Sequence, residues 1–213
     1  MKPLLLLLLT LLLKVPAGAP PKVRVTFSPL TKAAYLAAAK AAVVTKPVLT
    51  FPLKKVRGRI VIPTNSGPKV FKDNPVAEDD PDWEKYTYRG YSPQLECHLI
   101  EHSHYEWIGE ILLDKSGRQT EIFSMPFYSP DLRSFVTISA GIGYSVFPNE
   151  ISLSQFEKGH WREVWKLEPS VEPATWEPDE IKWLSNSTLL LKKKMWTGKS
   201  PGTTFTYAKL TIL

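Results

Sequence analysis

Three of the chain's four histidines lie in one short stretch and could together hold a metal ion. His98, His102 and His104 fall in a run that has the pattern of a β-strand. Because side chains in a strand alternate between its two faces, these three would project from the same face. Imidazoles that share a face, with a further ligand nearby and an open position for water, can form a catalytic zinc site. Zinc-dependent hydrolysis is therefore one hypothesis, and histidines scattered over the surface are its alternative.

No other stretch carries a recognisable catalytic motif. The sequence contains no glycine-rich phosphate loop, no His-Glu-x-x-His helix and no Gly-x-Ser-x-Gly elbow. The acidic residues 78–84 lack the ligand spacing of a calcium loop and are typical of a solvated loop. The single cysteine, Cys97, cannot form an intramolecular disulfide, and its apolar neighbours predict a buried, inert thiol. The leading interpretation is a non-enzymatic binding or scaffold protein whose ligand the sequence does not identify.

The first nineteen residues have the layout of a secretory signal peptide. Lys2 precedes an apolar run from Leu4 to Leu13, and the stretch ends in Ala17-Gly18-Ala19. A spanning helix needs about 20 apolar residues, so this run is too short to cross a bilayer. The sequence predicts a secreted or periplasmic protein with no transmembrane segment once the signal is removed. An envelope protein or a polysaccharide is the expected partner, and no specific nucleic acid is expected.

Charge is divided unevenly along the chain. Residues 1–72 contain thirteen lysines and arginines and no acidic residue, whereas residues 73–213 have a net charge of −7. Residues 20–55 form a basic arm rich in alanine, proline and lysine, with a short helix predicted from Thr31 to Ala42. The arm could bind an anionic surface, which is a third hypothesis for the function. It could equally lie against its own acidic domain.

From Val56 to Leu213 the pattern is that of short β-hairpins. Alternating strands flank glycine-containing turns at 63–67, 114–117 and 157–159. These hairpins predict an all-β domain made mainly of antiparallel strands. A β-sandwich is an alternative assembly of the same hairpins.

A short motif recurs three times in this domain. The stretch from Tyr91 to Ile100 aligns with that from Tyr128 to Thr137, and a looser copy runs from Trp183 to Leu191. In each copy an aromatic residue precedes a polar turn and then an apolar strand. Tyr128-Ser129-Pro130-Asp131 resembles the turn of TolB-like β-propeller repeats. This resemblance implies propeller-like, three-stranded modules and a binding or scaffolding role outside the cytoplasm.

Overall fold

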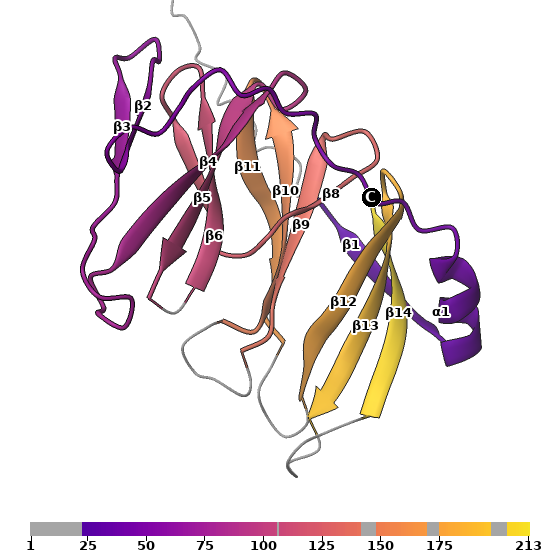
Figure 1. The fold of residues 1–213 in the computed structure, drawn as a ribbon. Coiled ribbons are helices and arrows are strands. Elements are labelled where there is room, and N and C mark those ends of the chain that lie inside the picture. Colours follow the sequence, from indigo (N-terminus) through magenta and orange to yellow (C-terminus); the bar gives the residue numbers. More distant parts are fainter. Residues whose placement is uncertain (1–22, 106, 142–147, 170–174, 197–203) are drawn as a thin grey trace, which may run out of the picture.

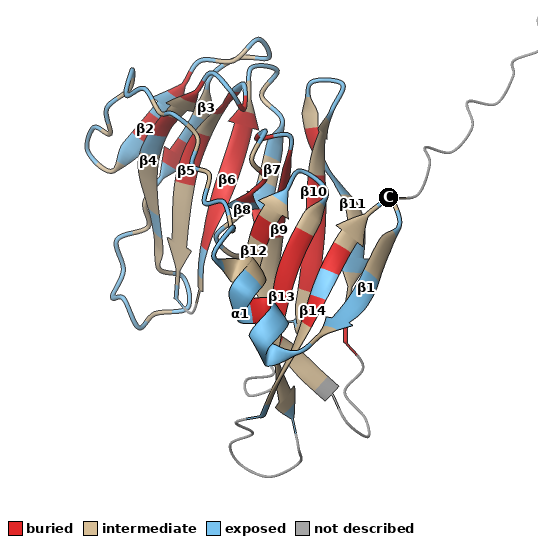
Figure 2. Ribbon diagram, turned by 90° about the vertical axis from the view of Figure 1, so that its right-hand side faces the viewer, coloured by how far each residue is buried: buried red, intermediate tan, exposed pale blue. Residues whose placement is uncertain are grey.

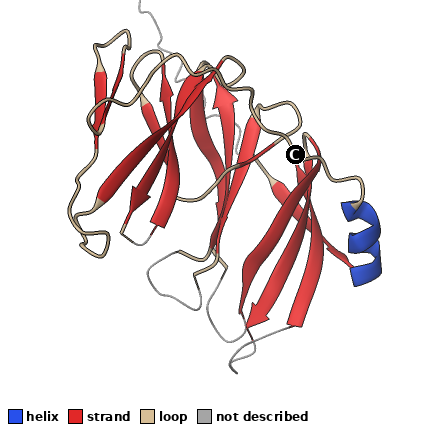
Figure 3. Ribbon diagram, viewed as in Figure 1, coloured by secondary structure: helices blue, strands red, loops and turns tan. Residues whose placement is uncertain are grey.

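The computed structural model describes residues 23–105, 107–141, 148–169, 175–196 and 204–213, and Figures 1 and 3 show its arrangement of strands. The described part is all-β apart from one short helix. None of its sheets is closed into a barrel. Among these residues no helix has the length and apolar composition needed to cross a bilayer. The predicted signal peptide lies outside the described residues.

Three four-stranded antiparallel sheets make up the body of the protein (Figure 1). The first sheet contains β4 (Glu84–Ser92), β5 (Cys97–His104), β6 (Trp107–Asp114) and β7 (Gln119–Ile122) in that order. The second contains β8 (Phe127–Tyr128), β9 (Ser134–Ser139), β10 (Glu150–Glu157) and β11 (His160–Leu167), also in chain order. The third contains β12 (Thr175–Ser185), β13 (Thr188–Trp196) and β14 (Thr204–Ile212), and β1 (Val25–Leu30) completes it by pairing with β14.

Two smaller elements cover the ends of this row of sheets. The hairpin of β2 (Arg59–Ile62) and β3 (Lys69–Lys72) packs Ile60, Ile62 and Phe71 against one face of the first sheet. Helix α1 (Lys32–Ala39) lies against the third sheet, where the Tyr35 ring is 4.7 Å from that of Tyr207. The hairpin and the helix therefore partly cover the outer faces of the first and third sheets.

Buried apolar side chains pack between the sheets. Figure 2 colours the buried residues red along the strands. One cluster joins the first and second sheets and includes Leu99, Leu112 and Phe135. A second joins the second and third sheets and includes Ile151 and Trp183. Side chains of adjacent residues on one strand enter different clusters because of the two-residue period of a strand. Thus β6 contributes Leu112 and Leu113 to opposite faces of the first sheet.

The predicted helix and hairpins are present, but each module has four strands rather than three. Helix α1 begins after Thr31, whose hydroxyl accepts a hydrogen bond from the Ala34 N–H at 3.1 Å. The fourth strand was missed because its signal is weak: β8 has two residues, and β1 comes from the other end of the chain. Pairing between strands that lie far apart in the chain leaves no local pattern in the sequence.

The recurring motif occupies a corresponding place in each sheet, namely the turn that joins an edge strand to its neighbour: β4 to β5, β8 to β9 and β12 to β13. In the first two copies the serine after the aromatic residue is fully buried and its hydroxyl caps the turn: Ser92 accepts a bond from Leu95 N–H, and Ser129 from Ser134 N–H. The repeat predicted from sequence is thus a structural repeat.

A strap, defined here as residues 43–56, connects α1 to the hairpin and crosses all three sheets. It makes isolated antiparallel bridges to the aromatic residue of every repeat, pairing Val43 with Trp183, Thr45 with Tyr128 and Thr50 with Tyr91. The Val43 N–H donates to the Trp183 carbonyl at 2.8 Å, and Thr50 and Tyr91 exchange two bonds of 2.9 and 2.8 Å. The strap and β1 both belong to the segment expected to form a basic arm, and both lie on the domain.

Candidate functional site

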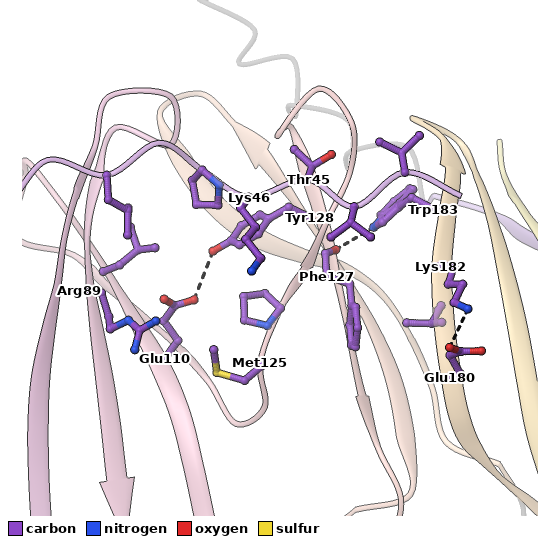
Figure 4. A pocket seen from close by; sticks show the side chains of 17 residues that line it. Thr45, Lys46, Arg89, Glu110, Met125, Phe127, Tyr128, Glu180, Lys182 and Trp183 are labelled. Carbon is purple, nitrogen blue, oxygen red and sulfur yellow. Dashed lines mark hydrogen bonds and ion pairs between the residues drawn. The ribbon is translucent and has the colours of Figure 1, made fainter. Parts of the chain in front are cut away.

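A pocket of about 490 Å³ lined by described residues lies beneath the strap. It lies where the strap passes over the edges of the sheets (Figure 4). Its volume falls in the range that small-molecule sites occupy. Most of the wall is apolar and comes from the strap and all three sheets: Val43, Val44, Pro47, Leu49, Leu99, Met125, Pro126, Phe127, Ile181 and Trp183.

Three polar side chains from different strands meet on one side of this pocket. Glu110 projects from β6, Arg89 from β4 and Tyr128 from β8 (Figure 4). The Tyr128 hydroxyl donates to Glu110 Oε2 at 3.3 Å. Arg89 forms an ion pair with Glu101 at 3.1 Å and is about half exposed. Glu101 lies directly opposite Glu110 across β5 and β6. The ion pair with Glu101 therefore holds the Arg89 side chain near Glu110.

Glu110 is the most perturbed acid of the described chain. Its side chain is only 6% exposed, and burial raises the pKa of its carboxyl group to about 7. The Tyr128 hydrogen bond and the positive charge of Arg89 oppose this rise in the pKa, while Glu101 adds to it. A carboxyl group with such a pKa can donate a hydrogen bond as the neutral acid or accept one as the anion near neutral pH.

Further charges lie at the rim of the pocket. Lys182 and Glu180 form an ion pair of 2.8 Å, so they largely neutralise each other. Glu180 also accepts a hydrogen bond of 2.7 Å from the Tyr35 hydroxyl, which ties helix α1 to this rim. Lys46 extends from the strap toward the pocket (Figure 4) and makes no ion pair with any other residue that the structure describes.

The three predicted metal ligands lie away from this pocket, on the opposite face of the first sheet. The Nδ1 atom of His98 is 2.9 Å from the Tyr88 hydroxyl. His102 stacks on Tyr86 with ring centroids 4.3 Å apart, and His104 stacks on Trp107 at 5.8 Å. Burial lowers the pKa of both His98 and His102.

The common face predicted for these histidines is therefore present, but their neighbours are mainly aromatic. His98 and His102 are separated along β5 by the fully buried Ile100. Within the described ranges no three His, Cys, Asp or Glu side chains are grouped so that they could hold a metal ion. A zinc site formed by His98, His102 and His104 stays a prediction from the sequence.

Cys97 is buried, as predicted, with 1% of its surface exposed. Burial raises the pKa of its thiol to about 12, so the thiolate is scarce at neutral pH. This cysteine belongs to the core between the first and second sheets.

The polar pocket residues were not predicted to form a site. Glu110 lies in an apolar run on β6, between Gly109 and Ile111, where an acid at an inward position is the one irregular feature. An acidic residue inside an otherwise apolar strand could have been noted as a candidate. The partners could not have been assigned, because Arg89 lies two strands away from Glu110 in the same sheet and Tyr128 comes from the second sheet.

Comparison with known proteins found no relative of this chain. No protein-family model, no curated protein and no solved structure matches the chain.

Proposed function

We propose that this chain is a non-enzymatic binding protein that holds a small, mainly apolar ligand in the pocket beneath the strap. The observation that carries the proposal is the combination of a 490 Å³ apolar space with three polar groups on one side, Glu110, Arg89 and Tyr128. Small-molecule sites typically have this composition, in which the apolar wall supplies affinity and a few polar groups fix orientation. Export and a role in the cell envelope remain parts of the proposal that rest on the N-terminal sequence.

The three sheets are best interpreted as propeller-like modules arranged in an open row. The repeated aromatic residue lies at or near the end of β4, β8 and β12, the edge strands of the three sheets, and the strap bridges all three of these residues. The support for this assignment is the repeated turn, which resembles TolB-like repeats. In such an assembly the first strands of neighbouring modules lie beside a shared space, which here is the pocket.

Binding of an apolar fluorescent probe tests the proposal. Nile red should bind the full chain saturably, with enhanced emission. Phe127→Ala removes a wall of the pocket and should weaken this binding several-fold, since burial of an aromatic ring against a ligand contributes about 1–3 kcal/mol. The matched control is Phe123→Ala: both phenyl rings are exposed, at 40% for Phe127 and 65% for Phe123, but Phe123 does not line the pocket.

Two results would contradict this function. One is the absence of saturable binding. The other is an equal loss in the Phe123→Ala control, which would place the probe on the exposed surface of the first sheet rather than in the pocket.

A further inference from the structure

The polar side of the pocket restricts which apolar ligands fit it. We propose that the natural ligand is an aliphatic carboxylic acid, bound as its carboxylate, whose chain occupies the apolar wall and whose head group meets Glu110, Arg89 and Lys46. This inference rests on the proposed function and adds the chemical class of the ligand.

Charge around the pocket favours an anionic head group. The rim pair Lys182 and Glu180 is internally neutral at 2.8 Å. Arg89 uses one guanidinium nitrogen for Glu101 and retains other N–H donors beside Glu110 (Figure 4). Lys46 has no acidic partner among the residues described. When Glu110 is protonated, the remaining uncompensated charge at this site is positive.

Glu110 is suited to bind a carboxylate in its neutral form. A protonated carboxyl group can donate a short, charge-assisted hydrogen bond to a ligand carboxylate, whereas an ionised one would repel it. Burial already favours the neutral form, because the pKa of Glu110 is raised to about 7. The Tyr128 hydroxyl donates to Glu110 Oε2, which leaves the other carboxyl oxygen for a ligand.

The charged and titratable groups near Glu110 come from four elements. Arg89 on β4 and Lys46 on the strap are positive, and Glu101 on β5 is already paired with Arg89. Tyr128 on β8 and Cys97 on β5 stay neutral, because burial raises both of their pKa values. The pH dependence of binding near neutral pH should therefore follow Glu110, whose pKa is raised to about 7.

The experiment compares three ligands that share a decyl chain and differ in the head group: decanoic acid, decanol and decylamine. Calorimetric titration of the full chain at about pH 6, where a free fatty acid is mainly ionised, should give binding of decanoate at least roughly tenfold tighter than the other two. Decanol or decylamine binding as tightly as decanoate would overturn the inference while leaving the proposed pocket intact. If Nile red binds and none of the decyl compounds does, the inference also fails alone.

Two variants locate the head group. Lys46→Gln should weaken decanoate binding about fivefold and leave decanol unchanged, as expected for one partly exposed charge pair. The matched control, Lys54→Gln, removes an exposed strap lysine that does not line the pocket and should have no effect on either ligand. Equal effects of the two substitutions would indicate general attraction to a basic surface and would contradict a defined head-group site.

The pH profile tests the role of Glu110. Decanoate affinity should fall as pH rises above about 7, by up to about tenfold per pH unit, because binding then requires uptake of one proton. Glu110→Gln keeps the shape and a hydrogen-bond donor but does not titrate, so its affinity should be nearly constant between about pH 6 and 9. A wild-type profile as flat as that of the variant would overturn the assignment of Glu110 to the head group.

Discussion

The two faces of the first sheet carry titratable side chains in very different surroundings. On the face toward the second sheet, Glu110 borders an apolar pocket and has one hydrogen bond, of 3.3 Å, from Tyr128. On the other face, His98 contacts the Tyr88 hydroxyl and His102 stacks on Tyr86. The histidine rings thus pack against aromatic side chains, although the His102 Nε2 atom is buried without a hydrogen-bond partner among the described residues, whereas the carboxyl group adjoins space that a ligand could fill.

This difference indicates that the histidines support packing, whereas Glu110 is available to bind a ligand. The histidine spacing correctly indicated a common face, because strand alternation is a local property. It could not indicate what covers that face, which is the hairpin of β2 and β3 together with a row of aromatic rings. In this protein, therefore, the histidine cluster in the sequence is weaker evidence for a binding site than the buried Glu110, which has few partners.

The largest expected change in the free energy of unfolding tests whether both faces of the first sheet are packed against a hydrophobic core. Leu112→Ala and Leu113→Ala each remove a side chain that is at most 1% exposed, Leu112 facing the second sheet and Leu113 facing the hairpin. Each should lower the free energy of unfolding by about 3 kcal/mol in urea titrations, through lost burial and the cavity left behind. The control, Val61→Ala on the exposed side of the hairpin, should cost under about 1 kcal/mol. A Leu113→Ala cost as small as that of Val61→Ala would mean that the hairpin does not cover this face.

The second prediction concerns the sign of the pH dependence on the pocket face. The folded-state pKa of Glu110 is about 7 and the unfolded value is about 4.5, so the native state binds the extra proton between these values. Glu110 therefore makes the protein less stable as pH rises from about 4.5 to 7, by up to about 3 kcal/mol. In urea titrations Glu110→Gln should gain stability relative to wild type over this interval and keep the gain at about pH 8. A difference between the two proteins that does not vary with pH would show that the carboxyl group is well solvated.

The same reasoning explains how much of the fold and the site could be predicted from sequence. The hairpins were predictable because a turn such as 114–117 contains glycine at the position that needs a positive φ, here 91° at Gly117. The repeat was predictable because its buried serines cap local turns. The grouping of strands into four-stranded sheets was not, since β1 pairs with β14 across the length of the chain. The pocket depends on that grouping and on the strap, so its residues could not be brought together from local patterns.

The third prediction tests the strap that closes the pocket. Gly90 adopts a φ of 138°, and a Cβ added there would overlap the Thr50 carbonyl oxygen. Gly90→Ala should therefore loosen the pairing of Thr50 with Tyr91 and cost about 2 kcal/mol, from strained backbone and steric overlap together.

Its control is Gly159→Ala in the turn between β10 and β11, which also has a positive φ, 83°, but has open space around the added Cβ. That variant should cost about 1 kcal/mol and leave the strap in place. Amide hydrogen exchange gives the readout: Thr50 and Tyr91 should exchange faster in Gly90→Ala alone. Unchanged protection of both amides in that variant would argue that the strap is held by contacts other than this pairing.

The smallest effect is expected on the histidine face and should have the opposite pH dependence to that of Glu110. Burial lowers the pKa of His102 below its ordinary value, so the unfolded chain takes up a proton at a higher pH than the native protein does. Protonation of His102 should therefore lower stability as pH falls through about 6.5, so on acidification the wild-type protein should lose more stability, or gain less, than His102→Gln does. His102→Gln also loses the stack on Tyr86, but this cost does not depend on pH. It cancels when the stability of each protein at about pH 5 is subtracted from its own stability at about pH 7. If acidification changes the stability of His102→Gln and of wild type by the same amount, then His102 is solvated in the native state and this face is more open than its contacts indicate.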